Sequence, residues 1–276
     1  MPARPRRQRR RRPTLAECAD RHVLYEEAVQ SPEHEIEFLE QTFKRLRGRQ
    51  PELLREDFCG TANVACTWAR RGARNRAIAV DIDPAVLDWG RKHHLLRLRP
   101  AVRARVTLLQ ADVLTVETEP ADIVVALNFS YWIFKDRARM RRYFENVRRG
   151  LKPDGLFVID AYGGSDAHRI LRERRKCGRF TYVWHQAEYD PVTNHITCHI
   201  DFVFSDGSRL PRAYTYHWRL WSLPELRELL AEAGFGRSTV YWQGTDEETG
   251  EESDEFNPVE RGEADPAWIA YIVAEP

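Results

Sequence analysis

Hydrophobic positions in this chain follow two different periods. From Thr14 to about Leu46 the pattern predicts helix, turn and helix, with Ser31-Pro32 as the start signal of an amphipathic helix. Farther along, short apolar runs rich in branched residues are separated by segments of helical pattern. The first strand leads through Leu54-Arg55-Glu56 toward a helix that begins near Ala62, and the later runs are Ala77–Val80, Val106–Leu109, Ile123–Leu127 and Leu156–Ile159. Strands that alternate with helices predict βαβ units, and therefore a mostly parallel sheet with helices on both faces.

Local signals place the ends of several elements. Asp83 followed by Pro84 is the expected start of the helix after the second strand. Lys152-Pro153-Asp154-Gly155 predicts a turn immediately before the fifth strand. Ser222-Leu223-Pro224-Glu225 has the pattern of a capping box at the start of a late helix. The acidic segment Thr245–Glu263 is interpreted as a solvated loop.

A different pattern interrupts the alternation of strands and helices after the fifth strand. Apolar residues alternate with polar ones in Ile196–Phe204 and again in Ala213–Trp221, which is the two-residue period of half-buried strands. With Tyr182–Glu188 they predict a small antiparallel sheet inserted into the main fold. Two further strands, Arg237–Trp242 and Trp268–Val273, bring the main sheet to seven. The expected organisation is a main domain of residues 14–164 and 222–276, with residues 165–221 inserted.

Charge is distributed unevenly along the 276 residues. The formal net charge is +1, but residues 1–12 carry seven arginines and no acid, so the remaining chain carries +1 − 7 = −6. Residues 1–13 are interpreted as a disordered extension, with contact to RNA phosphates as the alternative. The five cysteines form no C-x-x-C pair and follow no export signal, so a cytoplasmic protein without disulfides is expected. No run of eighteen uncharged apolar residues predicts a membrane span.

Polar residues stand where the predicted strands end. Glu56, Asp81, Asp112 and Asn128 each follow a short apolar run. In an open parallel sheet the ligand lies outside the carboxyl ends of the strands, so these four side chains are expected to come together. An acidic crevice of this kind suits a ligand that is cationic, rich in hydroxyls and equipped with an exocyclic amine. S-adenosylmethionine has all three features.

The order and spacing of these segments resemble the class I S-adenosylmethionine-dependent methyltransferases over residues 50–276. Glu56 followed by Cys59-Gly60-Thr61 is similar to the family's first loop, although Phe58 and Ala62 stand where glycines are usual. Val80-Asp81-Ile82-Asp83-Pro84 resembles the ribose-binding strand end, and Gln110-Ala111-Asp112-Val113 the site of the adenine amine. The resemblance implies a Rossmann-like fold and a cofactor site. Its expected residues are Glu56, Cys59, Gly60, Thr61, Asp81, Ile82, Asp112, Val113 and Asn128.

The inserted sheet resembles that of small-molecule N-methyltransferases, where it covers the substrate together with N-terminal helices. The resemblance implies that Tyr25–Gln30 lies over the cofactor, and that a nitrogen or oxygen of a small molecule attacks the sulfonium methyl in line and releases S-adenosylhomocysteine. Aromatic residues of the insertion and of the run after Asn128 would bind a cationic amine. Tyr131, His217 and Arg219 are the candidates for orienting the acceptor or receiving its proton.

The sequence gives weaker signals for other kinds of site. His195 and His199 are four residues apart, which on a strand separates the two rings by about 13 Å, too far for one zinc ion, so no metal is expected. Cys59 has no nearby base and is interpreted as a packing residue. Two alternatives to a small-molecule methyltransferase stay open. They are an RNA methyltransferase that uses the arginine-rich tail, and a non-catalytic protein that binds the same cofactor.

Overall fold

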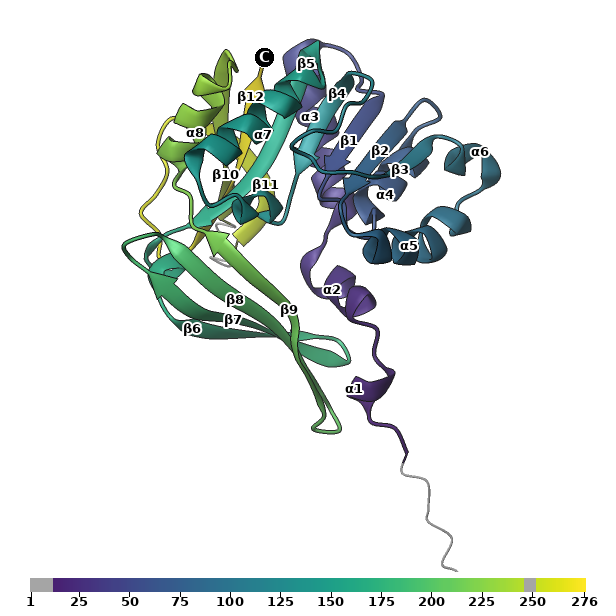
Figure 1. Cartoon of the computed structure of the whole chain (residues 1–276), viewed down its shortest axis with the longest axis vertical. Coiled ribbons are helices and arrows are strands. Elements are labelled where there is room, and N and C mark those ends of the chain that lie inside the picture. The colour runs from purple at the N-terminus through teal and green to yellow at the C-terminus, as the bar shows by residue number, and fades with distance from the viewer. Residues whose placement is uncertain (1–11, 246–251) are drawn as a thin grey trace, which may run out of the picture.

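A sheet of eight strands runs through the centre of the protein in the computed structural model, which describes residues 12–245 and 252–276 (Figure 1). Its spatial order is β11, β10, β12, β5, β4, β1, β2, β3. Along the chain these strands are β1 (Leu53–Asp57), β2 (Arg76–Asp81), β3 (Val106–Gln110), β4 (Ala121–Ala126), β5 (Leu151–Gly163), β10 (Arg237–Thr245), β11 (Glu252–Val259) and β12 (Trp268–Glu275). Neighbours among β1 to β5 are parallel, whereas β12 is antiparallel to both β5 and β10.

The expected doubly covered, mostly parallel sheet is confirmed, but the expected strand number is short by one. β11 lies in the acidic segment that the sequence assigned to a loop, and it pairs antiparallel with the edge strand β10. Composition did not indicate this strand because its pairing uses backbone groups and residues such as Glu255 and Asn257 stay exposed. The predicted turn at residues 152–155 is also wrong, since β5 already begins at Leu151 and its pairing with β4 shifts register there.

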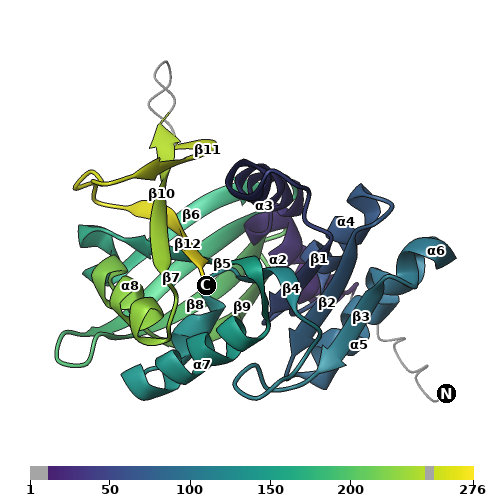
Figure 2. The same cartoon turned by 90° about the horizontal axis from the view of Figure 1, so that it is seen from above.

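Helices cover the two faces of the sheet, as the view from above shows (Figure 2). The apolar residues of α3 (Pro32–Arg47) and α4 (Asn63–Arg71) pack on one face together with Leu87 of α5 (Pro84–His93). The helices α7 (Arg137–Arg149) and α8 (Leu223–Glu232) pack on the other. The shorter helices are α1 (Leu15–Cys18), α2 (Arg21–Val29), α6 (Pro100–Arg103), η1 (Leu95–Arg97), η2 (Ser130–Ile133) and η3 (Ser165–His168).

Two of the predicted helix starts have the expected caps. The side chain of Asp83 accepts a hydrogen bond from the backbone N–H of Ala85, with Pro84 as the first helical residue. Ser222 and Glu225 form both hydrogen bonds of a capping box at the start of α8. These caps satisfy N–H groups that have no partner inside the helix.

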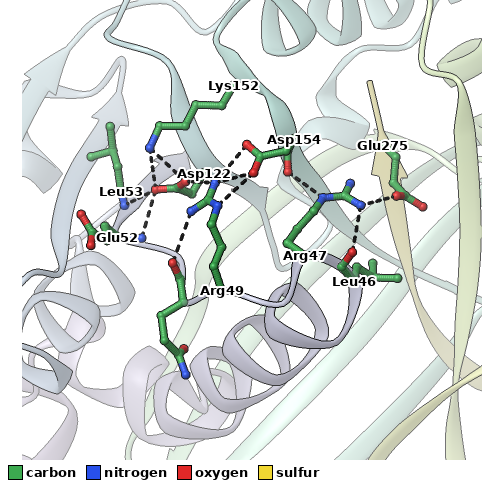
Figure 3. A network of polar contacts seen from close by, with 10 residues as sticks. Leu46, Arg47, Arg49, Glu52, Leu53, Asp122, Lys152, Asp154 and Glu275 are labelled. Carbon is green, nitrogen blue, oxygen red and sulfur yellow. Dashed lines mark hydrogen bonds and ion pairs between the residues drawn. The ribbon is translucent and has the colours of Figure 1, made fainter.

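A network of ion pairs closes the amino end of the sheet (Figure 3). Asp122, fully buried at the start of β4, accepts hydrogen bonds from Arg49 at 2.7 Å and from Lys152 at 2.9 and 3.0 Å. It also accepts from the backbone N–H groups of Glu52 and Leu53. Burial opposes the charge of Asp122, but these donors outweigh it and lower the pKa of the carboxyl.

The second sheet, which projects from the first, has four strands in the order β6, β7, β8, β9 (Figure 1). Their bounds are β6 (Leu171–Cys177), β7 (Phe180–Asp190), β8 (His195–Phe204) and β9 (Arg209–Arg219). All three pairings are antiparallel, which confirms the expected inserted sheet after β5. The sequence missed β6 because this edge strand, Leu-Arg-Glu-Arg-Arg-Lys-Cys, is exposed at its five central positions and carries no alternation. Whether residues 165–221 form a separate domain stays a prediction.

Candidate active site

The carboxyl ends of the parallel strands lie at one level and form the floor of the site. Asp57 is the register partner of Val80, and Asp81 is the partner of Gln110. On the other side, Glu56 is paired with Val125, one residue before the end of β4. The polar residues that follow these strands therefore share one edge of the sheet.

The loop after β1 has the backbone of a glycine loop without all of its glycines. Phe58, Gly60 and Ala62 have φ values of 57°, 52° and 58°, so all three are in the left-handed region. Non-glycine residues rarely adopt this conformation, and Phe58 and Ala62 keep it because their side chains are packed: the Phe58 ring lies 5.6 Å from that of Tyr143, and Ala62 is 1% exposed. The missing glycines therefore leave the loop geometry intact.

Two contacts hold this loop against its neighbours. The Gly60 N–H donates to Asp81 Oδ2 at 2.8 Å, which joins the loop to the end of β2. A Cβ on Gly90 of α5 would lie 2.1 Å from the backbone oxygen of Thr61, so only glycine lets α5 approach so closely. The sequence analysis did not single out Gly90. Cys59 is buried at 2% exposure, and burial raises the pKa of its thiol well above the ordinary value.

Glu56 and Asp57 point to opposite faces of β1, as neighbours on a strand must. Glu56 Oε2 accepts from the Ala65 N–H in the first turns of α4, on the side of the loop. Asp57 instead forms a buried ion pair with Arg55 at 2.8 Å and accepts from the Tyr143 hydroxyl at 3.1 Å. Of the two carboxylates, only Glu56 lies on the loop side of the strand.

The ends of β2 and β3 offer the polar and apolar groups expected of a nucleoside site. Asp81 accepts from Gly60 and from the Asp83 N–H, and burial raises the pKa of its carboxyl. Ile82 beside it is 67% exposed, an unusual state for a large apolar side chain. Asp112 is partly buried and accepts from the Leu114 N–H, while Val113 is 5% exposed. An exposed apolar face next to a carboxylate fits an adenosine, with the ribose on Asp81.

After β4 the chain makes a sharp bend that is held by β5. Asn128 and Phe129 both have left-handed backbones, with φ of 56° and 57°. Their N–H groups donate to the two carboxylate oxygens of Asp160, at 2.6 and 2.9 Å. The Tyr131 hydroxyl donates to the Asp160 backbone oxygen at 2.7 Å. Sequence analysis missed Asp160, because it lies inside an apolar strand rather than at its end.

A cavity of about 610 Å³ lies beyond this bend, between the central and the inserted sheets. Asn128 and Phe129 line it on the side of the central sheet. Aromatic side chains from α2, β5, β7, β9 and β12 form a large part of the remaining wall, and β6 adds the charged residues Glu173, Arg174 and Arg175. The aromatic lining residues are Tyr25, Phe129, Tyr162, Tyr182, Trp184, Tyr216, Trp218 and Trp268. The Tyr162 hydroxyl is buried next to the Cys198 thiol.

None of the three candidate catalytic residues lines this cavity. Tyr131 is fully buried, with its hydroxyl bonded to Asp160. His217 is exposed and contacts Thr197 on the other face of β9 from Tyr216. Arg219 pairs with Glu225 at 2.8 Å and lies over the Trp221 ring. Strand alternation explains the placement of His217 and Arg219, since odd-numbered residues of β9 face away from the cavity.

The helix α2 connects the cofactor side to the inserted sheet. Glu26 Oε1 accepts from the Thr61 hydroxyl at 2.5 Å and lies 2.7 Å from His94 Nε2. Asp20 accepts from the Trp89 indole of α5 at 2.7 Å. On its other side α2 contacts the inserted sheet through His22 and Tyr214, 3.1 Å apart. The helix therefore lies across the gap between the two sheets.

Three buried carboxyl groups gather behind the site, and none of them has a paired cation within residues 12–245 and 252–276. Burial raises the pKa of Glu56 well above its ordinary value, and it raises the pKa values of Glu35 and Asp160 to about 7. Repulsion by Asp160 adds to the shift of Glu35. Among the residues that the structure describes, none donates a hydrogen bond to the buried Glu35 Oε2, although the Ser31 backbone acts on the same carboxyl and opposes its shift. A cluster of buried carboxyl groups of this kind suits a ligand that carries a positive charge, as S-adenosylmethionine does.

Within residues 12–245 and 252–276, no group of three or more His, Cys, Asp or Glu side chains is arranged to hold a metal ion. No helix in the same residues combines the length and apolar character needed to cross a membrane. The arginine-rich tail, residues 1–13, lies almost entirely outside the described residues.

Comparison with known proteins agrees with this geometry. Residues 57–159 match the family model of a methyltransferase domain. A search of curated proteins found no match.

Solved structures with the same fold span almost the whole chain. An S-adenosylmethionine-dependent methyltransferase from Clostridium acetobutylicum is similar with a TM-score of 0.67 and 15% identity, over 92% of this chain and 96% of that one. CalS10, an amino pentose methyltransferase from Micromonospora echinaspora, has a TM-score of 0.63 and 17% identity, over 91% and 95%. The sugar N-methyltransferase KedS8 from Streptoalloteichus has a TM-score of 0.61 and 17% identity, over 93% and 92%. At these identities the likeness concerns the fold.

Proposed function

We propose, from the premise that this chain is a class I S-adenosylmethionine-dependent methyltransferase, that it methylates an amine nitrogen of a small molecule held in the aromatic cavity. The observation that carries the proposal is the position of this cavity. It begins at Asn128 and Phe129, which follow the last of the parallel strand ends on the cofactor side, and seven further aromatic residues line its other walls. Similarity to amino sugar methyltransferases supports nitrogen over oxygen.

The cofactor supplies an electrophilic methyl group on a sulfonium. The chain's own residues supply binding and position. Asp81 and Ile82 would hold the ribose and one adenine face, Asp112 would accept from the adenine amine, and the acidic group around Glu56 would face the cationic end.

Aromatic walls suit an amine in both of its protonation states. The ring faces attract a protonated amine as it enters, and they leave the nitrogen lone pair free of hydrogen bonds once the amine has released its proton to bulk water, before water is excluded from the site. The Tyr162 hydroxyl and Asn128 are the polar groups that we assign to orienting the acceptor, in place of Tyr131, His217 and Arg219. The reaction then requires the acceptor nitrogen within roughly 3 to 3.5 Å of the methyl group and exclusion of water.

The test is a screen for S-adenosylhomocysteine release with amino sugars, aromatic amines and small aliphatic amines, and with phenols as oxygen acceptors. Transfer of a labelled methyl group to nitrogen is the expected result. Binding of S-adenosylmethionine without methylation of any amine would contradict the proposal, and methylation of the phenols alone would change nitrogen to oxygen.

Trp184→Ala tests the cavity with a matched control on the same strand. Trp184 lines the cavity, whereas His185 lies on the opposite face of β7, 5.7 Å from His199. We expect Trp184→Ala to raise the acceptor KM roughly tenfold, by loss of about 1–2 kcal/mol of contact with the acceptor, and to leave S-adenosylmethionine affinity unchanged. His185→Ala should change neither quantity. Equal effects of the two variants on the acceptor KM would remove the cavity from the acceptor site.

A further inference from the structure

Two consecutive L residues in the left-handed region need a specific restraint, and Asp160 provides it for Asn128 and Phe129. Such residues persist only where the surroundings over-determine them. Here both N–H groups are bonded to one carboxylate, at 2.6 and 2.9 Å. The backbone oxygen of Asp160 is fixed in turn by the Tyr131 hydroxyl. The bend is therefore held from β5.

We propose that Asp160 is a positioning residue for methyl transfer, whose ionised carboxylate holds Asn128 and Phe129 as the partition between cofactor and acceptor. β4 lies between β1 and β5 in the sheet, so the bend after β4 separates the first loop from the cavity. Both residues line the cavity. The Phe129 ring lies 4.8 Å from Tyr162 and 5.4 Å from Trp132, so movement of the bend moves an aromatic wall.

The bend depends on the charge of Asp160 because each of its two carboxylate oxygens accepts one hydrogen bond. An ionised carboxylate accepts both N–H groups, and such charge-assisted bonds are stronger than neutral ones. A protonated carboxyl has a hydroxyl at one of these positions, and an asparagine has an NH₂ group there. Either change leaves one of the two N–H groups facing a donor.

The surroundings of Asp160 resist its ionisation. It faces Tyr25 from α2, Glu35 from α3 and Tyr131 from η2, and Tyr271 of β12 is its register partner. None of the ion pairs found in the described residues includes Asp160, which is 7% exposed. Burial raises the pKa of its carboxyl to about 7 although both N–H donors act against the shift. The partition should therefore loosen as the pH falls through about 7.

The experiment uses two cofactor analogues, so it needs no known acceptor. S-adenosylhomocysteine lacks the methyl group, whereas sinefungin carries an amine where the methyl group stands. The ratio of their Kd values, measured by calorimetry, reports on the surroundings of that position. We expect Asp160→Asn at pH 8 to weaken sinefungin about tenfold, as for loss of one hydrogen bond to a charged group, and S-adenosylhomocysteine less than about threefold.

The pH dependence gives a second readout. In the wild type the preference for sinefungin should fall between pH 8 and pH 6, where an ordinary amine stays protonated. In Asp160→Asn this fall should be smaller, because Glu35, whose pKa is also about 7, is then left to titrate over this range. Asp57→Asn is the matched control, since Asp57 is buried at the end of β1 but bonded to Arg55 on the other face. It should lower stability and leave the ratio as in the wild type.

Equal weakening of both analogues by Asp160→Asn would show a merely structural role and overturn the proposal. An unchanged ratio would do the same. If Asp160→Asn does not fold, the wild-type measurement decides, because a constant ratio from pH 6 to 8 contradicts the proposal. These outcomes are separate from the amine screen, which concerns the identity of the acceptor.

Discussion

At the scale of the residue, the first loop has the backbone conformation of a glycine-rich loop although two of its expected glycines are other residues. The first loop keeps left-handed residues at Phe58 and Ala62, where glycine would be free of strain. Each such residue costs on the order of 1–2 kcal/mol relative to glycine. The cost is offset by packing, since Ala62 is buried in the same cluster as Cys59 and Leu87. Packing thus stabilises a backbone that glycine would adopt without strain.

Ala62→Gly and Ala65→Gly test this account as a pair. Both remove one buried methyl group, because Ala62 and Ala65 are 1% and 0% exposed. Ala65 lies inside α4, where glycine adds about 1 kcal/mol of helix penalty, whereas Ala62→Gly relieves a left-handed residue. We expect a loss of about 2 kcal/mol for Ala65→Gly and less than about 1 kcal/mol for Ala62→Gly, from urea unfolding. Equal losses would contradict the account.

At the scale of the element, α2 belongs to both halves of the site. Its Glu26 contacts the first loop through Thr61, and its next residue, Glu27, pairs with Arg179 at 3.0 Å on the inserted sheet. The cofactor would have to pass this helix or move it. The contacts of Glu26 are half-buried, with side-chain exposures of 15% and 20% for Glu26 and His94, so they are less screened than a surface pair.

Replacing Glu26 should therefore change how tightly the cofactor is held. We expect Glu26→Ala to speed S-adenosylhomocysteine dissociation about three- to tenfold, as for loss of roughly 1 kcal/mol, because α2 no longer bonds to Thr61. Stopped-flow dissociation measures this rate. Glu27→Ala is the matched neighbour and should leave it unchanged. A similar acceleration in both variants would point to general loosening of α2 instead.

At the scale of the whole molecule, buried acids at the two ends of the central sheet have different surroundings. Asp122 at the amino end is surrounded by Arg49, Lys152 and backbone donors (Figure 3). Glu35 and Asp160 at the carboxyl end have raised pKa values of about 7. The paired acid at the amino end therefore contributes to stability, whereas burial of the acids at the carboxyl end lowers it.

These raised pKa values predict how stability without cofactor depends on pH. Between about pH 4.5 and 7 the folded state binds more protons than the unfolded chain. The stability that protonated Glu35 contributes is therefore present below this window and is lost as the pH rises through it. We expect Glu35→Gln to raise the free energy of unfolding by about 1–3 kcal/mol at pH 8 and by much less at pH 5, from urea unfolding.

Glu33→Gln is the control for this substitution. Glu33 is exposed and pairs with Arg71 at the surface, so its replacement should change stability by less than about 0.5 kcal/mol at either pH. An effect of Glu35→Gln that is the same at pH 5 and pH 8 would show that Glu35 does not titrate in this window.

The sequence by itself determined most of the elements and their order, because hydrophobic period, caps and strand-end acids are local properties, whereas the edge strands β6 and β11 carry no such pattern. Asp83, Ser222 and the doubly covered sheet were predicted in this way, and the cofactor followed from the residues after β1, β2 and β3. Only the tertiary structure decided which side chains meet. It placed Tyr131, His217 and Arg219 outside the cavity and brought Asp160 of β5 to the backbone of Asn128 and Phe129. Residues 32 positions apart become partners through strand pairing, and no local pattern in the chain records that pairing.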